Sequence, residues 1–241
     1  MSESFPYLSE HRRITFPSPE EADAHGLVAA GGNLSPGLLL SAYGQGIFPW
    51  YSEGEPILWW SPDPRFILFP DELHVAKSLR RTLNHGAFSV TLDQAFQEVI
   101  VACSVAPRRG QEGTWITDEM IDGYTTLHEL GYAHSLEVWK RGTLAGGLYG
   151  VSLGGMFFGE SMFARVSDAS KVGFVVLART LRQRGFDCID CQMYTGHLAR
   201  FGAREMSRSA FLGLLGRSLR RPTLRGDWQD ILGDDLHFVG R

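Results

Sequence analysis

Cysteines and long apolar runs are scarce in this sequence, and each scarcity excludes a class of protein. The 241 residues include three cysteines, Cys103, Cys188 and Cys191, which cannot form a disulfide framework and fit a reducing compartment. No apolar run approaches the ~20 residues of a membrane-spanning helix, and the start of the chain lacks the pattern of a secretory signal. We therefore expect a cytoplasmic protein with no membrane partner.

Lysine is also rare, since only three of the 23 basic residues are lysines. The net charge of −4 argues against indiscriminate nucleic-acid binding, yet the basic side chains are clustered. Lys77, Arg80 and Arg81 share one side of a predicted helix over 71–83, and seven arginines lie within residues 200–225. Either surface can hold phosphates, because arginine pairs with them in bidentate fashion, although a solvated helix face is the simpler interpretation.

Strand patterns dominate the second half of the chain. The runs 134–139, 144–151 and 156–163 are separated by turns that contain glycine, which predicts an antiparallel meander. A helix that opens near Ser170 and a fourth strand over 186–193 follow. The pattern by itself supports a mixed α/β sheet.

Three polar residues of these strands are candidates for chemistry. Alternation along the third strand predicts that Phe157 and Phe163 share one face and that Glu160 lies on the other, among apolar neighbours. A carboxylate there needs a donor or cationic partner, because burying it unpaired is costly. Asp190 and Gln192 stand two residues apart on one face of the fourth strand. In an arbitrary protein, such groups are more often structural than catalytic.

The first half of the chain is punctuated by proline and glycine. Capping residues predict helices over 35–43 and 117–130, and an apolar face predicts another over 93–103. A change in composition near residue 84 suggests a small N-terminal domain, 1–84, ahead of a larger domain, 85–241. Trp50 belongs to a group of three tryptophans within eleven residues, which is typical of a core and also suits a stacking platform for an exposed base.

Several short motifs match known sites but lack the required context. Gly150 to Gly154 matches G-x-S-x-G, but a strand follows where that motif needs a helix. Cys188 and Cys191 match C-x-x-C without a second pair, and His128-Glu129 lacks the second histidine of a zinc protease. We predict no metal site.

Longer motifs carry a family resemblance. FFGESMF, Ala169-Ser170-Lys171 and IDCQ resemble the C-terminal half of the leucyl/phenylalanyl-tRNA–protein transferases. GGNLSPGLLLSAYGQGIFPWY, ILWWSPDPR and EGTWIT match the N-terminal half in order and spacing, so the resemblance spans about residues 14–215. It implies an α/β (α+β) protein in which a small N-terminal domain precedes a GNAT-like acyltransferase domain with a mixed, largely antiparallel sheet.

The resemblance also implies an activity and its partners. It implies transfer of Leu, Phe or, less well, Met from aminoacyl-tRNA to proteins that begin with Arg or Lys, which marks them for N-end rule degradation. No cofactor is expected, because residues 164–171 lack the glycine-rich pyrophosphate loop of acyl-CoA enzymes. An acetyl-CoA-dependent N-acetyltransferase and a non-catalytic module that binds tRNA or degradation signals are the alternatives.

The resemblance assigns roles to particular residues. Asp190 and Gln192 would orient the acceptor amine, with Asp190 as a possible proton acceptor, and Glu160 would brace them. Thr195 stands where the family pattern has an asparagine. The expected aminoacyl-adenosine contacts are Tyr43, Trp50 and Trp115. The expected amino-acid pocket is formed by Leu148, Phe157, Phe174, Leu177 and Ile189. Of the two basic surfaces, we favour Lys77, Arg80 and Arg81 for tRNA binding.

Overall fold

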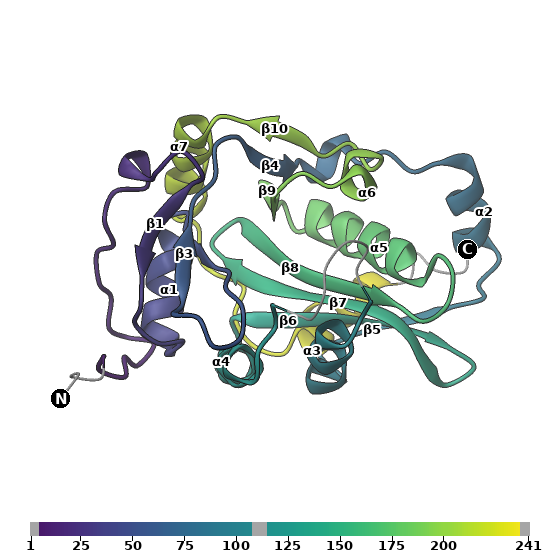
Figure 1. Ribbon diagram of the computed structural model, residues 1–241. Helices are drawn as coiled ribbons and strands as arrows, with labels where there is room; N and C mark the ends of the chain where they lie inside the picture. Colours follow the sequence, from purple (N-terminus) through teal and green to yellow (C-terminus); the bar gives the residue numbers. More distant parts are fainter. Residues whose placement is uncertain (1–4, 108–114, 237–241) are drawn as a thin grey trace.

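The computed structural model describes residues 5–107 and 115–236 (Figure 1). The first part of the chain forms a three-stranded antiparallel sheet with the order β1-β3-β2. Its strands are β1 (Leu27–Ala30), β2 (Phe48–Pro49) and β3 (Leu58–Trp60). Helix α1 (Pro36–Gly44) begins after Ser35, as the sequence predicts, and its side chains are buried from Pro36 to Tyr43.

A seven-stranded sheet with the order β10-β4-β9-β8-β7-β6-β5 forms the centre of the molecule. Its strands are β4 (Arg65–Leu68), β5 (Ser89–Leu92), β6 (Ala133–Lys140), β7 (Thr143–Leu153), β8 (Met156–Ala164), β9 (Cys188–Gln192) and β10 (Arg204–Met206). Neighbouring strands are antiparallel except for β8 and β9, which are parallel. The predicted meander and the mixed, largely antiparallel sheet are therefore confirmed.

Helices cover both faces of this sheet. The helices that follow α1 are α2 (Lys77–Asn84), α3 (Phe96–Ser104), α4 (Asp118–Glu129), α5 (Ala169–Gln183), α6 (Gly196–Ala199), α7 (Arg208–Ser218) and α8 (Trp228–Leu232), and 3-10 turns occur at Pro19–Glu21, Pro70–Glu72 and Gly233–Leu236. Helix α5 lies on one face, and α3 and α4 lie on the other (Figure 1). Leu148 and Tyr149 of β7 show the alternation, because Leu148 packs into the core on the α5 side and Tyr149 into the core on the α3/α4 side.

The turn between β6 and β7 illustrates how the sequence sets the register of the sheet. Arg141 and Gly142 both have positive φ, 52° and 77°, as a two-residue hairpin loop requires. This loop pairs Lys140 with Thr143. A β-bulge between Val138 and Trp139 then shifts the register by one residue, so Leu136 lies opposite Leu148 and Ala133 opposite Val151.

The predicted helix over 71–83 is wrong in its first half. The chain makes a 3-10 turn at Pro70–Glu72 and becomes helical again only at Lys77. The reason is tertiary, because the backbone N–H of His74 donates to the carbonyl of Phe201 at 2.8 Å and holds this segment outside a helix. The amphipathic face survives in α2, where Leu79 and Leu83 are buried.

Helix α3 likewise begins three residues later than predicted, because Asp93 has a non-helical backbone conformation and its side chain binds two other segments of the chain. Asp93 has a φ of 55°, and its carboxylate accepts from the backbone N–H groups of Ser135 and Trp228, both at 2.8 Å. Helix α4 begins as predicted, because the Thr117 hydroxyl accepts from the backbone N–H of Met120.

Strand β4 bears on the predicted division of the chain at residue 84. This strand precedes residue 84, yet it pairs with β9 and β10 in the seven-stranded sheet. The last strand of the predicted N-terminal domain therefore belongs to the larger sheet, and the domain boundary remains a prediction. Among residues 5–107 and 115–236, no helix is long and apolar enough to cross a membrane.

Candidate active site

Glu160 of β8 lies at the centre of a buried hydrogen-bond network. The Tyr43 hydroxyl donates to Oε1 at 2.7 Å, the Tyr124 hydroxyl donates to Oε2 at 3.0 Å, and Nε2 of Gln192 donates to Oε1 at 2.8 Å. Burial raises the pKa of Glu160 to about 7, although the hydrogen bonds from Tyr43 and Tyr124 oppose this rise. A carboxyl group with this pKa can take up or release a proton near neutral pH.

A β-bulge gives Glu160 its direction. Tyr149 of β7 pairs with Ser161 and Gly150 pairs with Gly159, so Glu160 is the extra residue on β8. The bulge reverses the alternation: Phe157 packs into the core on the α5 side, and Phe163 packs into the core on the α3/α4 side. The prediction that these two phenylalanines share a face is therefore wrong.

Gly150 allows the two strands to approach at this bulge. A Cβ atom at this position would lie 2.2 Å from the carbonyl oxygen of Phe158 and 2.6 Å from the Phe157 ring. Only glycine fits there without a shift of the backbone.

Asp190 of β9 forms a buried ion pair with Arg65 of β4. Arg65 Nε donates to Oδ1 at 2.9 Å and Nη2 donates to Oδ2 at 2.7 Å, and both side chains are fully buried. The guanidinium lies over the rings of Phe48 and Phe211, 4.7 and 4.6 Å from their centroids. The backbone N–H of Gln192 donates to Asp190 Oδ1 at 2.8 Å, while Gln192 adopts a φ of 63°. Asp190 thus holds Gln192 in an unusual backbone conformation.

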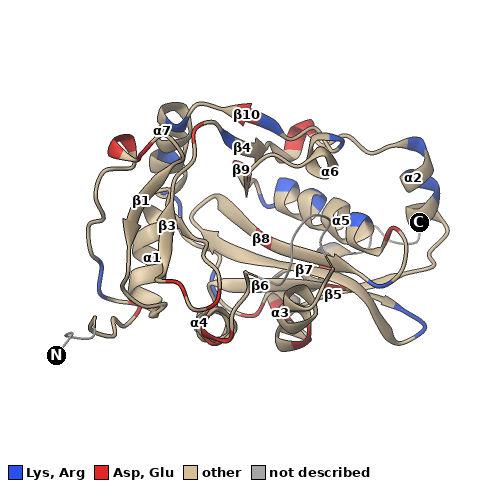
Figure 2. Ribbon diagram, viewed as in Figure 1, with Lys and Arg blue, Asp and Glu red and all other residues tan. Residues whose placement is uncertain are grey.

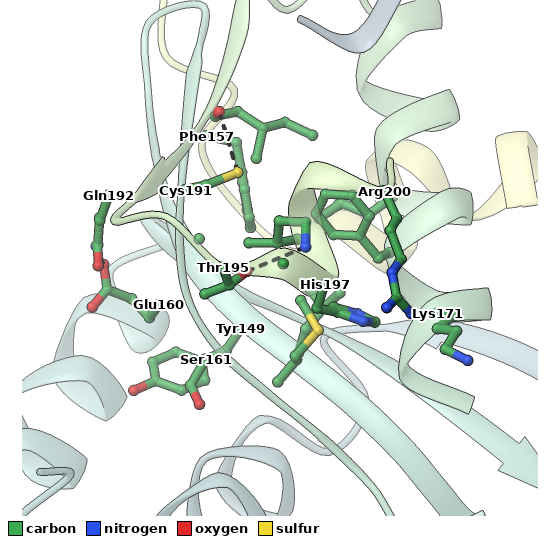
Figure 3. A pocket seen from close by; sticks show the side chains of 18 of the residues that line it. Tyr149, Phe157, Glu160, Ser161, Lys171, Cys191, Gln192, Thr195, His197 and Arg200 are labelled. Carbon is green, nitrogen blue, oxygen red and sulfur yellow. Dashed lines mark hydrogen bonds between the residues drawn. The ribbon is translucent and has the colours of Figure 1, made fainter. Parts of the chain in front are cut away.

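A cavity of about 1330 Å³ opens beside this network, between β8, α5, β9 and α6 (Figure 3). The structure brings all five residues of the expected amino-acid pocket to its wall, namely Leu148, Phe157, Phe174, Leu177 and Ile189. Glu160, Gln192 and Trp115 also line it. Figure 3 shows Glu160 and Gln192 on one side of the cavity, with Lys171 and Arg200 on the other.

Some of the residues expected at the site do not line this cavity. Asp190 is one, and a direct contact with an acceptor amine does not fit the structure, because Arg65 and the backbone N–H of Gln192 occupy its oxygens. Tyr43 is another: it is fully buried behind Glu160, so it cannot stack on an adenosine. Trp50 is half-buried, packs against Trp60 with 6.0 Å between the ring centroids, and also lies outside the cavity lining.

The remaining expected positions lie on helices. Thr195 lines the cavity, but its hydroxyl caps α6 by accepting from the backbone N–H of Leu198 at 3.2 Å. Lys77, Arg80 and Arg81 are exposed on α2 and do not line the cavity. No group of three or more His, Cys, Asp or Glu residues that could hold a metal ion occurs within 5–107 or 115–236.

The sequence reading missed Arg65 and Tyr124, which are both part of the network. The signal for Arg65 was available, because an arginine that begins the apolar run RFILF needs a buried partner for the same reason as Glu160 does. Tyr124 gave no comparable signal, since a tyrosine on the apolar face of a helix is an ordinary core residue.

Two family models match the chain in the regions that carry this site. The model described as leucyl/phenylalanyl-tRNA protein transferase N-terminal domain matches residues 32–63, and the model described as leucyl/phenylalanyl-tRNA protein transferase matches residues 67–216. The chain belongs to the leucyl/phenylalanyl-tRNA–protein transferase family. It is therefore a transferase, and Arg65 falls in the short interval between the two matches.

Three similar proteins match the sequence of this transferase over most of its length. A protein of Myxococcus xanthus named leucyl/phenylalanyl-tRNA–protein transferase is 58% identical over 92% of this chain and 95% of its own length. A protein of the same name from Syntrophus aciditrophicus is 59% identical over 89% of this chain and 90% of its own length. One from Stutzerimonas stutzeri is 57% identical over 90% and 96%, respectively.

Two of the solved structures that resemble this transferase are distant from it in sequence and in structure. The structure of L-PGS from Bacillus licheniformis matches with a TM-score of 0.40 and 10% identity, covering 74% of this chain and 65% of that protein. A GCN5-related N-acetyltransferase from Kribbella flavida matches with a TM-score of 0.36 and 8% identity, over 72% and 62%. Similarity at this level does not indicate an activity.

Proposed function

We propose that this protein transfers Leu, Phe and, less well, Met from aminoacyl-tRNA to the α-amine of proteins that begin with Arg or Lys. In this proposal the reaction takes place in the cytoplasm and marks the acceptor for N-end rule degradation. Family membership supports the transfer of an amino acid from tRNA to protein. The observation that supports the proposal best is that the apolar part of the cavity lies beside the hydrogen-bonded pair of Glu160 and Gln192.

The lining of the cavity suits the proposed amino acids. The five apolar residues Leu148, Phe157, Phe174, Leu177 and Ile189 leave room for a large unbranched or γ-branched side chain. An apolar pocket discriminates by only about 1–3 kcal/mol per methylene, so Met is expected to enter less effectively rather than be excluded. The β-branched Ile and Val should fit less well for reasons of shape.

The chemistry requires positioning more than strong acid–base catalysis. The aminoacyl ester is already activated, and an α-amine with a reference pKa near 8 is about a tenth unprotonated at neutral pH. Its nitrogen attacks the ester carbonyl, and the bond from that carbon to the ribose oxygen breaks. Holding the two reactants together supplies most of the acceleration.

Gln192 and Glu160 have distinct roles in this proposal. Because Gln192 Nε2 donates to Glu160, its Oε1 is the atom free to accept an N–H of the attacking amine. Glu160 takes the proton that the amine loses and then returns a proton to the leaving ribose oxygen, which becomes a hydroxyl. Asp190 and Arg65 are positioning residues, since they hold the backbone of Gln192 without reaching the cavity.

The nucleic-acid part of the substrate needs its own contacts. Trp115 lines the cavity, and we assign it to the adenosine. Lys77, Arg80 and Arg81 of α2 are assigned to the tRNA backbone. Figure 2 shows basic residues on α2 and along α5. Those of the two helices lie close enough to repel one another, because the pKa of Arg179 on α5 is lowered by burial and by the nearby Arg182 and Arg80. Such a cluster of like charges is stabilised by phosphates.

A direct assay tests this function. The protein is incubated with labelled Leu-tRNA and two acceptors that differ only in beginning with Arg or with Ala. Label should become covalently attached to the Arg acceptor alone, and Gln192→Ala should reduce the rate far more than it reduces tRNA affinity. Failure of the wild-type protein to transfer label to either acceptor would overturn the proposal.

A further inference from the structure

The cavity has a cationic end that the proposed chemistry does not use. Lys171 from the first turn of α5, His197 from α6 and Arg200 immediately after α6 all line it (Figure 3). Lys171 is paired with Asp168 at 2.7 Å. Arg200 is exposed and, within residues 5–107 and 115–236, has no acidic partner. The cationic end therefore carries more positive charge than the acidic groups of the described chain neutralise.

His197 lies near both permanent charges and has a polar atom without a hydrogen-bond partner among the described residues. Its Nε2 is buried without a hydrogen-bond partner among the described residues, while the ring packs edge-on against Phe201 with 5.3 Å between centroids. Burial lowers the pKa of His197, and Lys171 and Arg200 lower it further. A buried nitrogen that lacks a partner costs stability unless a ligand supplies one. An anion at this end would accept its hydrogen bond and relieve the repulsion among the three side chains.

We propose that Lys171, His197 and Arg200 bind the phosphodiester that joins the terminal adenosine of the tRNA to the preceding nucleotide. This inference rests on the proposed function, because it takes an aminoacyl-tRNA as the donor. If the ester lies beside Glu160 and Gln192, the attached adenosine extends along the cavity and its 5′ phosphodiester is the nearest anion of the donor. An acceptor that begins with Arg or Lys is repelled by the same end, so the arrangement also keeps the two substrates apart.

The contact would help to distinguish a nucleic-acid donor from a free amino acid ester. Arginine presents a planar pair of donors that matches two phosphate oxygens, and lysine adds a point charge. This subsite is separate from the three basic residues of α2, Lys77, Arg80 and Arg81, because none of them lines the cavity. It binds one defined phosphate, whereas α2 is proposed to contact the tRNA backbone farther from the reacting ester.

Binding of two small ligands tests the inference without requiring turnover. Adenosine and cytidylyl-3′,5′-adenosine differ by one phosphodiester and one nucleoside, and their dissociation constants are measured on the full chain. The wild-type protein should bind the dinucleotide at least about tenfold more tightly, as expected for a charge-assisted contact. Arg200→Gln should bring the ratio of the two constants close to one. Arg220→Gln removes an exposed charge outside the cavity and should leave the ratio unchanged.

The ionisation of His197 provides a second readout. Nuclear magnetic resonance should show its pKa rising when the dinucleotide binds and staying constant with adenosine. Equal affinities of the wild-type protein for the two ligands would overturn the inference, as would equal effects of Arg200→Gln and Arg220→Gln on their ratio. A phosphate preference that depends on Arg200, found together with no transfer from Leu-tRNA, would uphold this subsite and reject the proposed function.

Discussion

At the scale of single residues, the ionisation of Glu160 is expected to set the pH dependence of the reaction. Burial raises its pKa to about 7, so the carboxylate that accepts a proton forms only as the pH rises through about 7. The value of kcat/KM measured with Leu-tRNA should therefore increase across that range. Glu160→Gln should remove the increase in kcat/KM near pH 7 and leave only the increase caused by titration of the acceptor amine near pH 8. An unchanged profile in Glu160→Gln would show that another group accepts the proton.

The same shift has a consequence for stability. Because the folded-state pKa lies above the ordinary value of 4.5, ionising Glu160 costs folding free energy. The stability of the wild-type protein relative to Glu160→Gln should therefore be highest below pH 4.5 and fall as the pH rises through about 7. Urea denaturation at pH 5 and pH 8 measures this difference, and a difference that does not change with pH would contradict the shift.

The Arg65–Asp190 pair should behave as a buried unit. Arg65→Met leaves the Asp190 carboxylate buried without its main partner, which is expected to cost about 3–5 kcal/mol of unfolding free energy. Adding Asp190→Asn removes the stranded charge, so the double variant should be more stable than Arg65→Met alone. Urea denaturation of the two single variants and the double variant tests this, and additive losses would mean that the two side chains are not coupled.

At the scale of elements, we predict that the substrate, and not the fold, requires glycine at position 159 of strand β8. Gly159 lines the cavity, and a Cβ there would meet only the carbonyl oxygen of Asp190 at 3.6 Å, an ordinary contact. Gly159→Ala should therefore leave the melting temperature within a few degrees of the wild-type value while raising KM for Leu-tRNA several-fold. The matched variant Gly150→Ala should instead unfold the protein, since its Cβ would strike the backbone. Full activity of Gly159→Ala would show that no substrate passes over this residue.

The same strand shows where sequence patterns stop predicting structure. The alternation of apolar and polar side chains predicts strands and the turns between them. Strands β6, β7, β8 and β9 were predicted in this way. It cannot reveal a bulge, which arises from pairing between β7 and β8, so Phe163 was assigned to the wrong face. The helix predicted over 71–83 failed for a similar reason, since the bond from His74 to Phe201 links residues far apart in the chain.

At the scale of the whole molecule, the site is assembled from both halves of the chain, and this limited what the sequence could predict. The family resemblance assigned Leu148, Phe174 and Ile189 to the amino-acid pocket without any knowledge of contacts, and all three line the cavity. The motifs do not indicate which polar residues form hydrogen bonds with one another. Tyr43 is one example: it lies in a family motif next to several aromatic residues, yet its hydroxyl bonds to Glu160 from 117 positions away.

The tRNA, which is far larger than the cavity, must also contact the outer surface, and we predict that α2 supplies that contact. Lys77, Arg80 and Arg81 are exposed, while Leu79 and Leu83 hold the helix against the core. Replacing the three basic residues with Gln should therefore leave the fold intact and weaken tRNA binding. The slope of log K against log salt should also become shallower, by about 0.7 to 0.9 for each phosphate contact that is lost.

The matched control is the triple replacement of Arg204, Arg217 and Arg220 with Gln, which changes the net charge by the same amount at exposed positions of the other basic surface. If α2 carries the tRNA, this control keeps the wild-type salt slope, because exposed charges that lie farther than about one Debye length from the ligand are largely screened. Reaction with a short aminoacyl-adenosine donor should be nearly the same in both triple variants, since that donor has no backbone to reach α2. A salt slope that falls only in the Arg204, Arg217 and Arg220 variant would place the tRNA on that surface instead.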